Sequence, residues 1–349
     1  MGISFAKLLE RAVKAGASDL HISAGMPPMA RINGRLTQLG GCPELLAADT
    51  LALAEQALTP EQLEVFQETR DRDFSHTLPG LGRFRVSCFF QRGTVGMVVR
   101  LIASAAPSLE GLGLPPVLQD LICRKNGLLV ISGPSGSGKS TTLAAIVEEI
   151  NRKFNKHIIT LEDPVEYLHR SKKSIISQRE MGLDCGSYGR ALRAALRQDP
   201  DVIMVGEMRD LETVSTVITA AETGHLVLAS LHTASAPQSI ERIIDVFPPH
   251  QQQQVRLQLA NSLIGIISQL LLPRKGGGRV LAAEVLVANA AVRNLIREGK
   301  VYQIGSIMQV SGELAMSTMD ASLQDLLERG IISGEEASAY AVRAKERPG

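Results

Sequence analysis

The spacing of apolar side chains divides this chain into two regions with different predicted structure. Residues 5–15 carry apolar side chains at helical intervals, which predicts an amphipathic helix. "SDLHISA" (18–24) and "MARINGRLTQL" (29–39) alternate like strands, and Asn33-Gly34 within the second predicts a hairpin. Helical spacing returns near 47–57 and 60–69, and three strand-like runs follow. Residues 1–102 are therefore predicted to form a small α+β domain with an antiparallel sheet.

A segment rich in Pro, Gly and Ser, "SAAPSLEGLGLPP", lies within residues 103–116, which we predict to be a linker. Beyond it the pattern changes. Four continuous apolar runs alternate with helical segments: "GLLVISG", "HIITLED", "DVIMVGE" and "GHLVLASLH". Such runs are typical of a mostly parallel sheet that is covered on both faces. From about residue 248 the pattern predicts several helices and a strand pair near "RVLAAEVLV", so residues 117–349 are predicted to form an α/β domain.

Composition limits the kinds of partner. The 37 Lys and Arg residues balance 36 Asp and Glu residues, so net charge gives no general attraction to nucleic acid. Aromatic residues make up 3% of the chain and Trp is absent, which disfavours base-stacking surfaces. The four cysteines lie far apart, and the first twenty residues carry charges throughout and lack a signal-like apolar core. The longest apolar region, Leu263 to Leu272, is too short to span a bilayer, and we expect a cytoplasmic protein.

A glycine-rich segment, "GPSGSGKST", lies between a predicted strand and a predicted helix and fits G-x4-G-K-[ST]. Its glycines allow successive backbone N–H groups to point at phosphate oxygens, and the helix start adds positive potential. Lys139 is predicted to reach the β and γ phosphates and Ser140 to hold Mg²⁺. The motif predicts ATP or GTP binding by Gly133, Pro134, Ser135, Gly136, Ser137, Gly138, Lys139, Ser140 and Thr141.

Acidic residues follow two of the predicted strands. Glu162, Asp163 and Glu166 lie in "IITLEDPVEYLH", and Glu207 lies just past "DVIMV". The carboxyl ends of parallel strands line the ligand crevice. A carboxylate there can orient the water that attacks γ-phosphate and accept its proton, and Glu207 occupies the usual place of the acid that holds the Mg²⁺ shell. For any single acid, a solvated strand end is the alternative.

Two histidines bracket the fourth apolar run in "AETGHLVLASLHT". We expect His232 at the carboxyl end, where it can reach γ-phosphate or a neighbouring carboxylate and sense the phosphate. An imidazole suits this role because one nitrogen can donate while the other is anchored. His225 lies at the opposite end of the run. A subunit contact and a simple hydrogen bond to the backbone remain open for it.

Taken together, these motifs resemble the secretion ATPases of type II secretion and type IV pili, and within them the pilus retraction ATPases. The matching segments run in order along essentially the whole chain: "ASDLHISAGMPPMARINGRL", "GPSGSGKSTTLAA", "ITLEDPVEYLH", "DPDVIMVGEMRDLETV", "TAAETGHLVLASLHTASA" and "AVRNLIREGK". The resemblance implies a PAS-like N-terminal domain joined to a RecA-like P-loop motor domain, assembled as a homohexamer that uses ATP and Mg²⁺.

The resemblance also implies roles for single residues. Glu166 is expected to be the catalytic base, with Glu162 as the competitor, and Glu207 to be the acid of the second nucleotide motif. His225 and His232 correspond to the family's histidine pair. Arg85 and Arg100, on adjacent strands of a predicted hairpin, match family arginines that contact the nucleotide, and two guanidiniums on one edge suit phosphate capture. The alternative is two solvent-facing strand arginines.

The function that the resemblance implies is a motor at the cytoplasmic face of the inner membrane. It would act on the pilus platform protein and withdraw pilin, without nucleic acid and with a paralogous retraction ATPase as a candidate partner. The absence of a four-cysteine zinc module around "LLPRKGGGRVLAAE" favours retraction over assembly. The alternatives are an accessory retraction paralog, a pilus-assembly or type II secretion ATPase, a nucleic-acid translocase and a non-hydrolysing regulator. For "AVRNLIREGK", both a partner contact and internal packing remain open.

Overall fold

The structure, a computed structural model, describes residues 4–32, 34–102, 106–310 and 316–341. The chain divides into two compact units, residues 1–105 with 166–168, and residues 106–165 with 169–349. The predicted linker, 103–116, begins with residues 103–105, which lie outside the described part. After them, Leu109 is buried in the second unit beside Leu118 and Leu121, so this part of the segment is packed.

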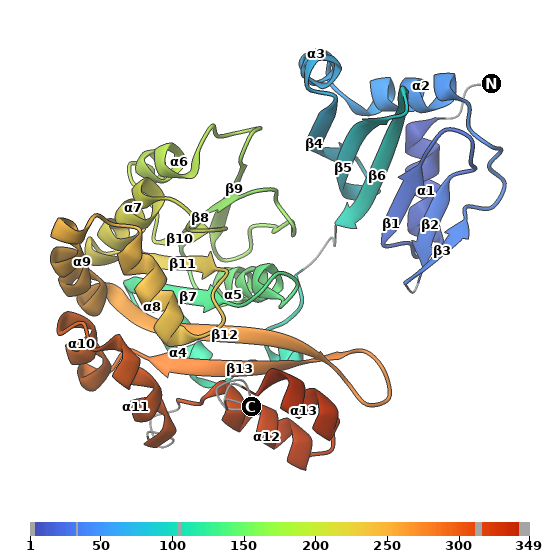
Figure 1. Ribbon diagram of the computed structural model, residues 1–349. Helices are drawn as coiled ribbons and strands as arrows, with labels where there is room; N and C mark the ends of the chain where they lie inside the picture. The colour runs from blue at the N-terminus through green and yellow to red at the C-terminus, as the bar shows by residue number, and fades with distance from the viewer. Residues whose placement is uncertain (1–3, 33, 103–105, 311–315, 342–349) are drawn as a thin grey trace. The chain divides into compact units, whose positions relative to one another are not determined.

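The first unit is built on a six-stranded antiparallel sheet in the order β3-β2-β1-β6-β5-β4 (Figure 1). Apolar residues of α1 and α2, such as Leu8, Leu9 and Leu53, are buried with strand residues such as Val99 in one core. The predicted α+β unit with an antiparallel sheet is confirmed. The elements are α1 (Phe5–Lys14), β1 (Asp19–Ile22), β2 (Met29–Ile32), β3 (Arg35–Gln38), α2 (Ala47–Ala57), α3 (Pro60–Thr69), β4 (Asp71–Leu78), β5 (Gly82–Gln91) and β6 (Thr94–Ile102).

The second unit is built on a seven-stranded sheet in the order β13-β12-β7-β11-β10-β8-β9. All neighbouring pairs are parallel except β12 with β13, which confirms the predicted α/β fold. Every residue of β7 and β11 is buried, as expected for strands covered on both faces. The strands are β7 (Gly127–Ser132), β8 (His157–Glu162), β9 (Ile175–Glu180), β10 (Val202–Val205), β11 (Leu226–Leu231), β12 (Leu263–Pro273) and β13 (Arg279–Val287).

Helices cover both faces of this sheet (Figure 1). One apolar core gathers side chains of α6 to α11 on one face, and a second gathers those of α4 and α5 on the other. Several of these helices begin after a residue whose side chain accepts a backbone N–H, as Asp210 does for α7. The helical elements are η1 (Glu110–Leu112), α4 (Val117–Ile122), α5 (Lys139–Lys153), α6 (Tyr188–Ala195), α7 (Leu211–Glu222), α8 (Ala236–Asp245), α9 (Pro249–Ser262), α10 (Ala290–Arg297), η2 (Val301–Gln303), α11 (Ile304–Val310), α12 (Met319–Glu328) and α13 (Gly334–Tyr340).

Strand β9 was not predicted from the sequence. It lies at the sheet edge and pairs only with β8 among the described strands. Its side chains are mostly half-buried, and Ile175 is exposed, so it lacks the continuous apolar run of the central strands. None of the described helices combines the length and the apolar character that a membrane span requires.

Candidate nucleotide-binding and catalytic site

The glycine-rich loop curls tightly between β7 and α5. Gly133, Gly136 and Gly138 have φ values of 146°, 78° and 90°, a region that glycine adopts without strain. A Cβ on Gly133 would lie 2.4 Å from the carbonyl oxygen of Gln269 and 2.5 Å from Oγ of Ser137. The loop therefore requires glycine at this position for space as well as for conformation.

Lys139 is the first residue of α5, and its side chain is folded back into the loop. Its Nζ donates to the carbonyl oxygens of Gly133 at 2.8 Å and Pro134 at 3.0 Å. Beside it, Oγ of Ser137 is buried with no hydrogen-bond partner in the described part of the chain. The first backbone N–H groups of a helix also lack partners within the helix. An ammonium, an unpaired hydroxyl and a helix start in one curl fit a bound phosphate group.

A chain of polar contacts joins the loop to the ends of β10 and β11. His232 Nδ1 lies 3.4 Å from Lys139 Nζ, and His232 Nε2 lies 3.4 Å from Glu207 Oε1. Arg209 Nη2 approaches Glu207 Oε2 at 2.8 Å. Burial raises the pKa of Glu207, but Arg209 and His232 outweigh burial and hold this pKa below its usual value. Glu207 is therefore ionised at neutral pH and presents a negative charge beside the phosphate loop.

Glu162 ends β8 and is almost fully buried. Its Oε1 accepts from Thr160 Oγ1 at 2.7 Å and from Gln178 Nε2 at 3.1 Å. The phenol of Tyr188, at the start of α6, lies near the carboxylates. Burial first, and then Asp163, Glu207 and Glu162, raise the pKa of Tyr188, so this side chain stays protonated. Carboxylates of Glu162 and Glu207 thus lie at the carboxyl ends of β8 and β10, near the neutral phenol of Tyr188.

Glu166 and His225 have other surroundings. Glu166 is exposed in the loop after β8 and is not a member of the contact chain Lys139–His232–Glu207. His225 lies at the opposite end of β11 from His232, and its Nδ1 lies 3.0 Å from the carbonyl oxygen of Ala220. A backbone hydrogen bond therefore accounts for His225 within the second unit.

Comparison with known proteins places the chain in a family. The model of the family described as type II/IV secretion system protein matches residues 3–277. The chain belongs to the type II/IV secretion system protein family. The type IV pilus retractation ATPase PilT of Pseudomonas aeruginosa is 46% identical over 331 residues, which cover 95% of this chain and 96% of that protein. The type IV pilus ATPase PilU of the same organism is 42% identical and covers 99% of this chain and 90% of its own.

A solved structure agrees with these relatives. The crystal structure of the pilus retraction motor PilT with bound ADP has a TM-score of 0.93 and 48% identity to this chain, and 99% of each chain is covered. The predicted resemblance to the pilus retraction ATPases is confirmed.

Arg85 and Arg100, which were predicted to contact nucleotide, lie in the first unit. Arg85 of β5 and Arg100 of β6 are direct cross-strand partners, so their side chains project from the same face. Arg100 Nε donates to Asp19 Oδ1 at 2.9 Å, and Arg85 Nη2 lies 3.7 Å from Asp73 Oδ2. Each arginine therefore has a carboxylate partner within its own unit.

The segment "AVRNLIREGK" of this family member forms α10 and packs internally. Val292, Leu295 and Ile296 are buried in the core of the second unit. Arg293 donates to the carbonyl oxygens of Ala288 at 2.9 Å, Asn261 at 3.2 Å and Leu263 at 3.3 Å. Arg293 thus holds the end of α9 and the start of β12 against α10, which is a packing role.

A cavity of about 340 Å³ adjoins the phosphate loop. Its lining includes Ser137, Gly138 and Thr141 of the loop and the start of α5, and Arg279 of β13. The remaining lining includes the side chains of Leu112, Leu271 and Leu281. An apolar cavity with one cation beside a phosphate site suits a purine base.

The sequence analysis did not identify four residues of the candidate site: Tyr188, Gln178, Arg209 and Arg279. Arg209 follows Glu207 by two positions and could have been noticed from that spacing. Tyr188 and Gln178 carry no signal in the sequence, because they reach the acids only through the packing of α6 and the pairing of β9 with β8.

Proposed function

We propose that this protein hydrolyses ATP and uses the energy to retract type IV pili. The observation that carries the proposal is the contact chain Lys139–His232–Glu207, which joins the phosphate loop to the ends of two parallel strands. The names of the relatives PilT and PilU, and the ADP bound to the PilT structure, support the substrate and the cellular task.

Each part of the site has a role in the reaction. Lys139 and the N–H groups of the loop bind the β and γ phosphates, and the cavity beside Arg279 takes the base. Glu166, with Glu162 as the competitor, accepts a proton from the water that attacks the γ phosphorus while the bond to the ADP oxygen breaks. Ser140 and Glu207 would hold Mg²⁺, which neutralises phosphate charge when bound. Among the described residues, no group of three or more His, Cys, Asp or Glu side chains is placed to hold a metal ion.

The assembly and partners follow from the resemblance. We propose a homohexamer at the cytoplasmic face of the inner membrane that acts on the pilus platform protein. Arg85 and Arg100 are proposed phosphate-binding residues, and His225 a residue of the family's histidine pair. PilU-like relatives make an accessory retraction role the second candidate, because PilU matches nearly the whole chain.

The test of the function uses purified full-length protein. Phosphate release from ATP should be saturable, and light scattering should give the mass of six chains. Expression in a pilated strain that lacks its retraction ATPase should restore pilus withdrawal. A protein that binds ATP without turnover would instead be a regulator, and one that restores withdrawal only together with a second retraction ATPase would be the accessory paralog.

Removal of the His232 imidazole is expected to slow hydrolysis strongly. In His232→Ala, Lys139 and Glu207 lose the group that links them, and we expect kcat to fall by about 10²-fold, as for loss of one stabilising donor. His157→Ala is the matched control, because His157 lies at the far end of β8 and contacts Asp199 and Ser177. Normal turnover and normal ATP trapping in His232→Ala would remove the phosphate-sensing role.

The cavity beside the phosphate loop predicts a binding defect without a catalytic defect. Arg279→Ala is expected to raise KM for ATP by about 10-fold, the scale of one lost cation contact to a base, while kcat stays near its native value. Arg274→Ala, in the same β12–β13 hairpin but outside the cavity lining, is the control. Unchanged KM in Arg279→Ala would place the base elsewhere.

A further inference from the structure

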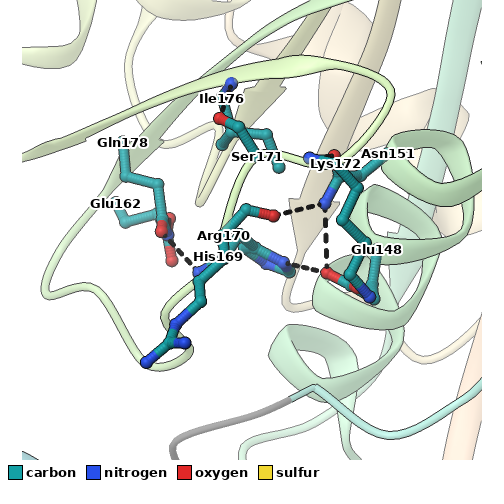
Figure 2. A network of polar contacts seen from close by, with 9 residues as sticks. All are labelled: Glu148, Asn151, Glu162, His169, Arg170, Ser171, Lys172, Ile176 and Gln178. Carbon is teal, nitrogen blue, oxygen red and sulfur yellow. Dashed lines mark hydrogen bonds and ion pairs between the residues drawn. The ribbon is translucent and has the colours of Figure 1, made fainter. Parts of the chain in front are cut away.

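The loop between β8 and β9 is tied down on both sides of Glu166. This loop connects Glu162, the end of β8, to Ile175, the start of β9. One attachment lies at Val165, directly before Glu166, and the other at His169, three residues after it. Figure 2 shows the second attachment, with side chains from α5, β8, β9 and the loop itself.

The first attachment is the buried carboxylate of Glu180. Its Oε2 accepts the backbone N–H of Val165 at 2.9 Å, and both residues are buried. Glu180 ends β9 directly opposite Glu162 of β8. The next N–H of the chain, that of Met181, donates to the carbonyl oxygen of Glu162 at 2.8 Å. Glu180 therefore lies at a paired strand end, so the sheet fixes the backbone from which its carboxylate reaches Val165.

The second attachment has a backbone part and a side-chain part. The backbone N–H of His169 donates to Gln178 Oε1 at 2.8 Å. The Nε2 group of the same Gln178 side chain donates to Glu162 Oε1 at 3.1 Å. The ring of His169 is almost fully buried, with Nδ1 3.0 Å from Glu148 Oε2 (Figure 2). Glu148 lies on α5 and also pairs with Lys172.

Asn151, one turn further along α5, strengthens this attachment. Its Nδ2 donates to the carbonyl oxygen of Arg170 at 2.8 Å, and its Oδ1 accepts the N–H of Lys172 at 2.9 Å (Figure 2). Asn151 is fully buried, so these bonds face no competition from water. Because α5 begins at Lys139, the loop after His169 is held by the same rigid helix that carries the phosphate-binding lysine.

We infer that Glu180 and the His169–Glu148 pair are positioning residues that fix the two ends of the span carrying Glu166, and so set where its carboxylate stands. The inference rests on the proposed function, in which Glu166 is the base. Only residues 166–168 lie between the two attachments. Three residues span a short distance even when fully extended, so fixing both ends limits where Glu166 can lie. A base must stand within hydrogen-bond reach of its water, and a displacement of about 1 Å can cost on the order of 10²-fold in rate.

Single substitutions in the full-length protein test each attachment. Glu180→Ala removes the acceptor for Val165, and kcat is expected to fall about 10- to 100-fold with KM for ATP changed less than about threefold. Glu180→Gln keeps an oxygen acceptor and is expected to restore most of the rate. His169→Ala should behave like Glu180→Ala, and His169→Asn, whose amide can replace Nδ1 as a donor to Glu148, should restore activity.

The matched control is Asp201→Ala. Asp201 also uses a carboxylate oxygen to accept a backbone N–H, that of His157 at 2.9 Å, but at the opposite end of β8. Its loss should lower the melting temperature while leaving kcat near native at 25 °C. An equal loss of kcat in Asp201→Ala would show that general destabilisation, and not positioning, explains the Glu180 result.

A double-mutant cycle with Glu166 gives the decisive readout. If Glu180 acts through Glu166, Glu180→Ala should cost no further rate in a Glu166→Gln background, measured by single-turnover hydrolysis of radiolabelled ATP. An equal cost in both backgrounds, or native kcat in Glu180→Ala, overturns the inference and leaves the proposed ATPase function intact. Absence of hydrolysis by the native protein overturns both.

Discussion

Replacement of Lys139 by alanine is expected to abolish ATP hydrolysis. The ammonium lies inside the curl of the phosphate loop, where it holds two carbonyl oxygens and approaches His232. Its loss removes the cation that is proposed to bind the β and γ phosphates, and the contact to His232 is lost with it. Loss of one group that stabilises the transition state electrostatically lowers kcat by about 10²–10³-fold. Weaker binding of the ATP phosphates in the ground state lowers the observed rate further. Phosphate release should therefore fall to background.

Lys156→Ala is the control for Lys139→Ala. Lys156 pairs with Asp201 before the start of β8, at the end of the strand opposite Glu162. This variant should retain native hydrolysis, and both variants should keep the native mass in light scattering. Hydrolysis by Lys139→Ala above a few per cent of native would show that the glycine-rich loop does not bind the reacting phosphates.

The second large effect separates the two candidate bases. Glu166→Gln keeps the size of the side chain but removes its basicity, so kcat is expected to fall about 10²–10⁴-fold while nucleotide binding is retained. Glu162→Gln should lower kcat by less than about tenfold. Oε1 of Glu162 already accepts hydrogen bonds from Thr160 and Gln178, so its role is that of a fixed acceptor. Quenched-flow hydrolysis and binding of a fluorescent ATP analogue measure the two effects separately.

The reverse order of effects would exchange the two roles. If Glu162→Gln stopped turnover and Glu166→Gln did not, the buried acid at the end of β8 would be the base. The attachments at Val165 and His169 would then hold a loop without a catalytic group. Equal and small effects would instead favour the non-hydrolysing regulator.

Much of the fold could be predicted from the sequence because its signals are local. The helix at 5–14, the antiparallel pairing of β2 with β3 and the helices at 47–57 and 60–69 follow from spacing and turn chemistry, while Asn33 of the predicted turn lies outside the described residues. The central strands follow from continuous apolar runs, since a strand buried on both faces has no polar side. Strand β9 could not be predicted, because an edge strand buries only part of its side chains and its identity depends on the partner strand.

The candidate site was predictable to the extent that motifs mark strand ends. The phosphate loop and the positions of Glu162, Glu207 and His232 follow from strand-loop-helix order and from the rule that parallel strands end on the same edge. The order of the strands decides which of these residues meet. Because β11 lies between β7 and β10, His232 stands between Lys139 and Glu207 and can contact both.

The sequence alone determined the family of this protein, its two kinds of sheet and its phosphate-binding loop, because each depends on residues that are close together along the chain. Only the tertiary structure decided that His225 bonds to its own turn, that Arg293 holds α9 and β12, and that Glu180 and His169 hold the loop of Glu166. These contacts depend on which side chains the packed sheet and helices bring within 3 Å or so of each other, and no spacing along the chain encodes that distance.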